Sequence, residues 1–120
     1  PLRAAAAFAV EEHARAVEAV WSLREAAECR RDDVLKALGA SLHAAHEGYT
    51  ALGLGCPETD AMVDAIRSLG PARGFYGGRI SGGGSGGTVA VLLEEQALAD
   101  LETLADRMTV SRTGGVRILR

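Results

Sequence analysis

The sequence has few of the residues that several protein classes require. Its two cysteines, Cys29 and Cys56, are too few for a disulfide scaffold or a four-thiolate metal site, so a reduced, cytoplasmic setting is the default expectation. Aromatic residues make up only 4% of the chain, which argues against surfaces that stack nucleic-acid bases. No stretch approaches the roughly 20 apolar residues that span a bilayer. We therefore expect no membrane segment, and residues 1–3 show no signal-peptide pattern.

Positive charge is also scarce. Thirteen Lys and Arg against sixteen Asp and Glu give a net charge of −3, which does not favour a nucleic-acid partner. Apolar residues at 48% and charged residues at 24% are ordinary globular values, so disorder is not expected. At 120 residues the chain is predicted to be one domain. Because it begins without Met, we also consider that it is part of a larger protein.

The first part of the sequence is typical of helices. A first helix is predicted over about 3–30, and a second begins near Asp32, so that the two form an antiparallel hairpin. Gly39 in the second helix predicts a close helix–helix approach. A third helix is expected to begin at Pro57 and to end at Gly70. The first helix has an apolar stripe, predicted to be buried, that consists of Val10, Ala14, Val17 and Trp21.

The second part predicts two strands, at about 75–81 and 88–93, and the short glycine-rich connection between them favours an antiparallel hairpin. A fourth helix follows Glu94, and a last short strand is expected at 116–119. The fold class is therefore α+β, with an antiparallel sheet and helices packed on one side of it.

The connection between the strands holds five glycines in six positions, 82–87, which costs conformational entropy on folding. Three explanations stay open. The backbone approaches a ligand closely, and its successive N–H groups bind an anion such as phosphate. Alternatively, the glycines satisfy unusual φ and ψ angles of a tight turn, or they form a flexible linker. The strand-like residues on both sides weaken the linker explanation.

Residues 75–91, FYGGRISGGGSGGTVAV, resemble the third signature motif of the GHMP kinases, and among these the galactokinase-like sugar kinases with their arabinokinase branch. Residues 46–49 and 53–60 are similar to the segments that precede this motif in the family. Two small residues, Ala45 and Gly48, stand where the family pattern has serines, so a hydroxyl-mediated role of that helix is not carried over.

The resemblance implies a ferredoxin-like plait extended by the N-terminal helical hairpin. It implies that residues 1–120 are a single domain, the C-terminal one of a two-domain kinase that uses ATP and Mg²⁺ to phosphorylate a sugar. The nucleotide cradle and the catalytic Asp would lie in an absent N-terminal domain, so this chain alone is expected to show no kinase activity and to bind no cofactor. The residues implied to line the phosphate-transfer cleft are Ser81, Gly82, Gly83, Gly84, Ser85, Gly86 and Gly87, with Arg79 beside them.

Several residues have a competing structural interpretation. Arg79 either orients the turn or approaches phosphate, or else points outward into solvent. His43 and His46 lie three residues apart on a helix, a spacing that suits two metal ligands but more often packing residues. Tyr49 and Trp21 are expected in the core. Asp60 matches a position of the family in the third helix, or else is an ordinary acid at a helix start. Cys56 either caps that helix or is an inert thiol, and the inert thiol is favoured.

Two further functions stay open beside the kinase domain. In the first, the chain is a stand-alone module that binds a small ligand or has a regulatory role, because the same fold can carry different functions. Alternatively, the face around the turn serves homo-oligomerisation. An exposed apolar patch beside the turn would indicate either this role or a contact with the absent domain.

Overall fold

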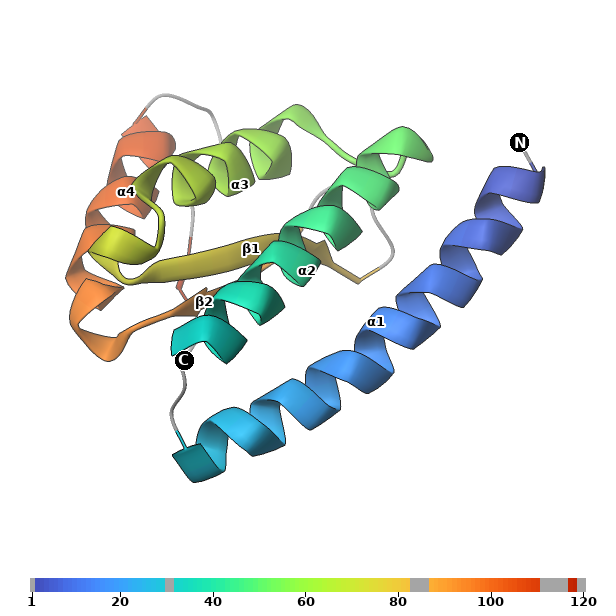
Figure 1. Cartoon of the computed structure of the whole chain (residues 1–120). Coiled ribbons are helices and arrows are strands. Elements are labelled where there is room, and N and C mark those ends of the chain that lie inside the picture. Colours follow the sequence, from blue (N-terminus) through green and yellow to red (C-terminus); the bar gives the residue numbers. More distant parts are fainter. Residues whose placement is uncertain (1, 30–31, 83–86, 111–116, 119–120) are drawn as a thin grey trace.

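The computed structural model of the chain describes residues 2–29, 32–82, 87–110 and 117–118. The α+β class is confirmed (Figure 1). None of the helices within these residues is long and apolar enough to cross a membrane. In chain order the elements are α1 (Leu2–Cys29), α2 (Asp32–Ala51), α3 (Pro57–Leu69), the 3₁₀ turn Pro71–Arg73, β1 (Phe75–Ser81), β2 (Thr88–Leu93), the 3₁₀ turn Glu95–Ala97 and α4 (Leu98–Val110).

The expected antiparallel hairpin is confirmed. β1 and β2 pair from Ser81 opposite Thr88 to Phe75 opposite Leu93, with one irregularity between Phe75 and Gly77. Of the strand expected at 116–119, only two residues lie in the described part of the chain. These are Arg117 and Ile118, and neither belongs to a strand. Ile118 instead packs against the core as a partly buried side chain.

The core lies between α3, β1 and α4. Pro57 is at the first turn of α3 and Gly70 ends that helix with a φ of 67°, as the sequence predicts. The buried face of α3 contributes Met62 and Ile66, which pack with Phe75 of β1. On the other side of this cluster, Ala97 and Leu101 close the core.

At Gly39 of α2 and Gly77 of β1, the two backbones meet without side chains between them. A Cβ on Gly39 would collide with the carbonyl group of Tyr76, and a Cβ on Gly77 would lie 2.6 Å from Gly39 Cα. The close approach predicted at Gly39 is therefore real, but the prediction of a helix–helix contact was wrong. The partner of α2 at this point is a strand.

α1 is the outermost element and lies along α2 (Figure 1). The prediction that Val10, Ala14, Val17 and Trp21 are buried was wrong, since Val10 is 72% and Trp21 64% exposed. The less exposed positions also follow a helical repeat, but on the opposite side. These positions are Phe8, Glu12, Arg15, Ala19, Ser22 and Ala26.

Candidate functional site

The glycine-rich connection joins the two paired ends of the hairpin. The structure describes the residues at its two ends. Gly82 has a φ of 90° and Gly87 a φ of 105°, values that residues other than glycine rarely adopt. Nothing lies within 4 Å of where a Cβ would sit at either position, and Ser81 is exposed. At these two glycines the explanation by turn geometry therefore applies, and both are exposed to solvent. The central residues, Gly83, Gly84, Ser85 and Gly86, lie outside the described part.

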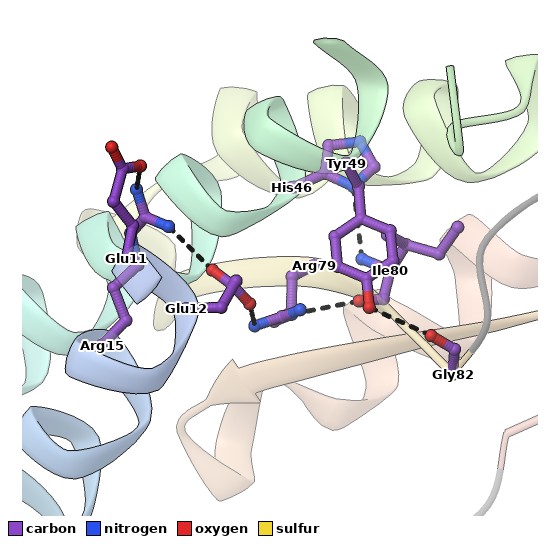
Figure 2. Close-up of polar contacts among 8 residues, drawn as sticks. All are labelled: Glu11, Glu12, Arg15, His46, Tyr49, Arg79, Ile80 and Gly82. Carbon is purple, nitrogen blue, oxygen red and sulfur yellow. Dashed lines mark hydrogen bonds and ion pairs between the residues drawn. The ribbon is translucent and has the colours of Figure 1, made fainter. Parts of the chain in front are cut away.

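Tyr49 of α2 holds the first residue of this connection. Its hydroxyl donates a hydrogen bond to the carbonyl oxygen of Gly82 over 3.1 Å (Figure 2). Its ring makes an edge-to-face contact with Phe8 of α1, at a centroid distance of 5.3 Å and an interplanar angle of 83°. Tyr49 is half-buried, so it joins the outer helix to the turn rather than filling the core as expected.

Arg79 of β1 is turned toward α1, so of the alternatives considered for this residue the outward, solvated one is wrong. Its side chain is 22% exposed, and its Nη1 donates to Glu12 Oε2 over 2.7 Å. The Nε atom donates to the carbonyl oxygen of Ile80 over 3.0 Å. The guanidinium carbon lies 5.3 Å from the centroid of the Tyr49 ring, within the range of a cation–π contact. Three contacts thus fix this side chain beside the turn.

The ion pair of Arg79 continues along α1. Glu12 also accepts a hydrogen bond from Arg15 Nη1 over 2.8 Å, and Arg15 Nη2 lies 3.1 Å from Glu11 Oε2 (Figure 2). These carboxylates raise the pKa of Arg15, chiefly through the hydrogen bond to Glu12. Two carboxylates thus face two guanidinium groups, and the positive charge of Arg79 is compensated within this network.

His46 of α2 lies beneath the same end of β1. It is buried, with 5% exposed, and its Nδ1 accepts a hydrogen bond from the Ile80 N–H over 3.2 Å. Its Nε2 lies 3.1 Å from Asp60 Oδ1, to which Thr50 also donates over 3.3 Å. Because Nδ1 accepts, the proton is on Nε2 and faces the carboxylate. His46 thus joins α2, α3 and β1, and Asp60 is part of this contact rather than only a helix-start acid.

His43 lies one turn earlier on α2 and faces the backbone of Gly78 in β1, while its buried Nδ1 has no hydrogen-bond partner among the described residues. Burial, and next the positive charge of Arg67, lower the pKa of His43 below its usual value. Both histidines of the considered metal pair therefore face the strand. No group of three or more His, Cys, Asp or Glu that suits a metal ion occurs within the described ranges.

Gly48 makes room for the outer helix. A Cβ at this position would lie 2.5 Å from the ring of Phe8, so even an alanine would push the ring away. The glycine that departs from the family pattern thus has a packing reason in this chain. Cys56 precedes α3 without capping it through a side-chain hydrogen bond, and its Sγ lies 3.3 Å from Thr59 Oγ1.

The structure brings together some predicted residues and adds others. Arg79, Ser81 and Gly82 lie at one end of the hairpin, and His46 and Tyr49 support it from α2. Sequence reasoning missed Phe8 and Glu12, which come from the outer helix; Glu12 is 67 positions away from Arg79. The sequence could have indicated their position only in one way: both residues lie on the side of α1 opposite the stripe that contains Val10 and Trp21.

Comparison with known proteins gives matches over most of the chain. The family described as GHMP kinases C terminal matches residues 19–109. A galactokinase from Thermosipho africanus is 31% identical over 106 residues, which are 88% of this chain and 27% of that protein. A galactokinase from Thermotoga maritima is 33% identical over 102 residues, 84% of this chain and 26% of that protein.

An L-arabinokinase from Arabidopsis thaliana is 39% identical over 67 residues, which are 51% of this chain and 6% of that protein. The chain therefore spans about a quarter of the length of the matched galactokinases and a much smaller part of the arabinokinase. What it shares with them is a domain-sized segment.

Proposed function

The chain belongs to the GHMP kinase family as a C-terminal domain, and from this premise we propose that it serves an ATP-dependent sugar kinase. In this proposal the glycine-rich turn lines a phosphate-transfer cleft that forms with an N-terminal domain outside this sequence. The substrate is a sugar hydroxyl, by likeness to the galactokinases and the arabinokinase.

The observation that carries the proposal is a firmly held hairpin whose described residues on either side of the turn are exposed. Ser81, Gly82 and Gly87 are exposed, and no side chain covers the two glycines within the described ranges. Phosphoryl transfer depends on positioned groups and on charge stabilisation, and backbone N–H groups in such turns suit phosphate oxygens. Glycines at 82–87 let the backbone approach the phosphates without interference from Cβ atoms.

The residues around the turn are positioning residues in this proposal. Tyr49 holds the Gly82 carbonyl group, while Arg79 and His46 hold the two backbone groups of Ile80. In this proposal Arg79 positions the backbone of the turn and does not bind phosphate itself, because its charge is already paired with Glu12. Fixing the base of the turn from both sides lowers the reorganisation needed when the phosphates bind.

ATP would supply the transferred phosphoryl group, and Mg²⁺ would neutralise charge on its phosphates. Within this chain, the residues proposed to meet the nucleotide are the backbone groups of 81–87. The ligands of the metal and the groups that recognise the sugar are assigned to the other domain.

The proposal is tested with the whole polypeptide whose reading frame carries this chain. We expect ATP turnover that depends on an added aldose, measured by ADP release over a panel that includes galactose and arabinose. The 120-residue chain alone should show none. A whole polypeptide without aldose-dependent turnover contradicts the kinase proposal, and micromolar calorimetric binding of a metabolite to the chain alone favours the stand-alone module instead.

The role of the turn has a matched control. Gly82 and Gly53 both have positive φ angles, and at neither position does another atom lie within 4 Å of where a Cβ would sit. Gly82→Ala and Gly53→Ala should therefore carry similar backbone strain, roughly 1–2 kcal/mol each. We expect Gly82→Ala to lower kcat of the whole polypeptide about tenfold or more, and Gly53→Ala to leave it nearly unchanged. Equal effects would remove the turn from the reaction.

A further inference from the structure

All the large hydrophobic side chains that are exposed in the described part of the chain lie on one helix, α1. Among them Val17 is 45%, Val20 49% and Leu23 50% exposed, in addition to Val10 and Trp21. The core elements α3, β1 and α4 leave no such side chain exposed within the described ranges. The distribution is therefore uneven, and the apolar surface is concentrated at one side of the molecule.

Most of these side chains lie on one face. At 100° per residue, Val10, Val17, Val20 and Trp21 fall on the side of α1 that points away from α2, and we call this set the outer face. Leu23 lies nearer the packed side and is not part of this set. Exposed alanines lie between them, and polar residues also lie on this side of the helix, namely Arg3, His13, Arg24 and Glu28. The glutamates Glu11, Glu18 and Glu25 lie along one border.

The outer face is more apolar than the side of α1 that packs on α2. The packed side includes Glu12, Arg15 and Ser22, whereas the outer face carries three valines and the one tryptophan of the chain. Contiguous exposed apolar surface of this kind marks an interaction site in soluble proteins.

We propose that the outer face of α1 docks against the N-terminal part of the same kinase polypeptide. This inference rests on the proposed function, which places that polypeptide before the present chain. The occupant is thus an apolar surface of the absent domain, not a second copy of this chain.

The extent of the family match supports this occupant. The match begins at residue 19, so the first 17 residues of α1, 2–18, precede the matched C-terminal segment although the helix runs on unbroken. The matched galactokinases are also about four times as long as the aligned segment, since it covers 26–27% of them. Polypeptide of this length is enough to cover a helix of about 42 Å.

The position of α1 relative to the turn is a second argument for docking of the N-terminal part on the outer face. Phe8 and Glu12, on the packed side of the same helix, contact Tyr49 and Arg79 at the base of the turn. Figure 2 shows α1 reaching this end of β1. A domain seated on the outer face would therefore lie within reach of the turn that it is proposed to complete.

The test measures how accessible the outer face is in the whole polypeptide. Val17→Cys is placed on the outer face and Glu18→Cys on its border, each in a chain with Cys29→Ser and Cys56→Ser. Maleimide labelling at the new cysteine is followed by peptide mass spectrometry. In the 120-residue chain both should label at similar rates. In the whole polypeptide we expect labelling at position 17 to slow at least tenfold and labelling at position 18 to change less than threefold.

The outcomes separate this proposal from the kinase proposal. Aldose-dependent ADP release is measured on the same samples. Active polypeptide with rapid labelling at position 17 overturns the docking and leaves the kinase. Inactive polypeptide with slow labelling overturns the kinase and leaves the docking. If light scattering shows that the 120-residue chain dimerises and that Val17→Lys abolishes the dimer, the occupant is a second copy. A reading frame without preceding polypeptide overturns both proposals.

Discussion

α1 and α2 are both long helices rich in alanine, but they are attached to the molecule in opposite ways. α2 meets β1 backbone to backbone at Gly39 and through the buried ring of His46. α1 rests on α2 and leaves its valines and Trp21 in solvent. The comparison teaches that apolar residues make a helix amphipathic, while small residues and buried hydrogen bonds decide which helix comes closest to the sheet.

The contact between α2 and β1 is the first place to break the comparison. Gly39→Ala should destabilise the chain by about 3 kcal/mol or more, because the new Cβ collides with the Tyr76 carbonyl group and backbone on both sides cannot yield. Urea unfolding measures the effect. Gly53→Ala is the control, with strain but no collision. A loss below about 1 kcal/mol at Gly39 would contradict the close packing of α2.

The buried hydrogen bonds of α2 come next. His46→Ala leaves the Ile80 N–H without its acceptor and should cost roughly 1–3 kcal/mol. The corresponding change on the outer helix, His13→Ala, concerns an exposed ring and should stay within about 0.5 kcal/mol. Unfolding curves for the two variants give the comparison directly. Similar values for both would mean that the bond of His46 does not stabilise the fold.

The pH dependence sharpens the same contrast. Burial lowers the pKa of His43 in the folded chain below its reference value of 6.5, so the unfolded chain binds the proton more readily. Stability is therefore highest above that value and falls as the pH decreases through it toward the folded pKa. The urea midpoint should drop between pH 8 and pH 5, and His43→Gln should reduce the drop. An unchanged drop would assign it to other groups, and His13→Gln serves as the exposed control.

The smallest effect concerns the bond between α2 and the turn. Tyr49→Phe removes only the hydroxyl that donates to Gly82 and should cost about 0.5–1 kcal/mol, because the bond is exposed. Tyr49→Ala also removes the ring contacts to Phe8 and Arg79 and should cost more. Thermal unfolding separates the two. If the two variants lose equal stability, the ring contributes nothing to holding α1.

Local patterns in the sequence predicted the elements well. The strands at 75–81 and 88–93 and the start of α3 at Pro57 agree with the structure, because turn residues and β-branched runs act over short distances. The buried side of α1 was not predictable in this way. A helical repeat of apolar residues shows that a face is apolar, but Val10 and Trp21 show that it does not tell what covers the face.

The candidate site was predictable only in part. The motif indicated the turn and Arg79, yet the partner of Arg79 is Glu12, 67 positions earlier in the chain. In the sequence this glutamate looks like any solvated acid, and only the packing of α1 on α2 brings it to the strand. The histidines were recognised as a pair, but their position at the backbone of β1 depends on how closely Gly39 lets α2 approach.

The contact between Phe8 and Gly48 makes the residues at two positions that are distant in the sequence depend on each other. An aromatic ring at position 8 fits only while position 48 carries hydrogen alone, since a Cβ would lie 2.5 Å from that ring. Homologous chains with serine at the equivalent of 48 should therefore have a smaller residue at the equivalent of 8. In this chain Gly48→Ser should be harmful by itself and tolerated together with Phe8→Ala, so evolution would have to change the two sites together.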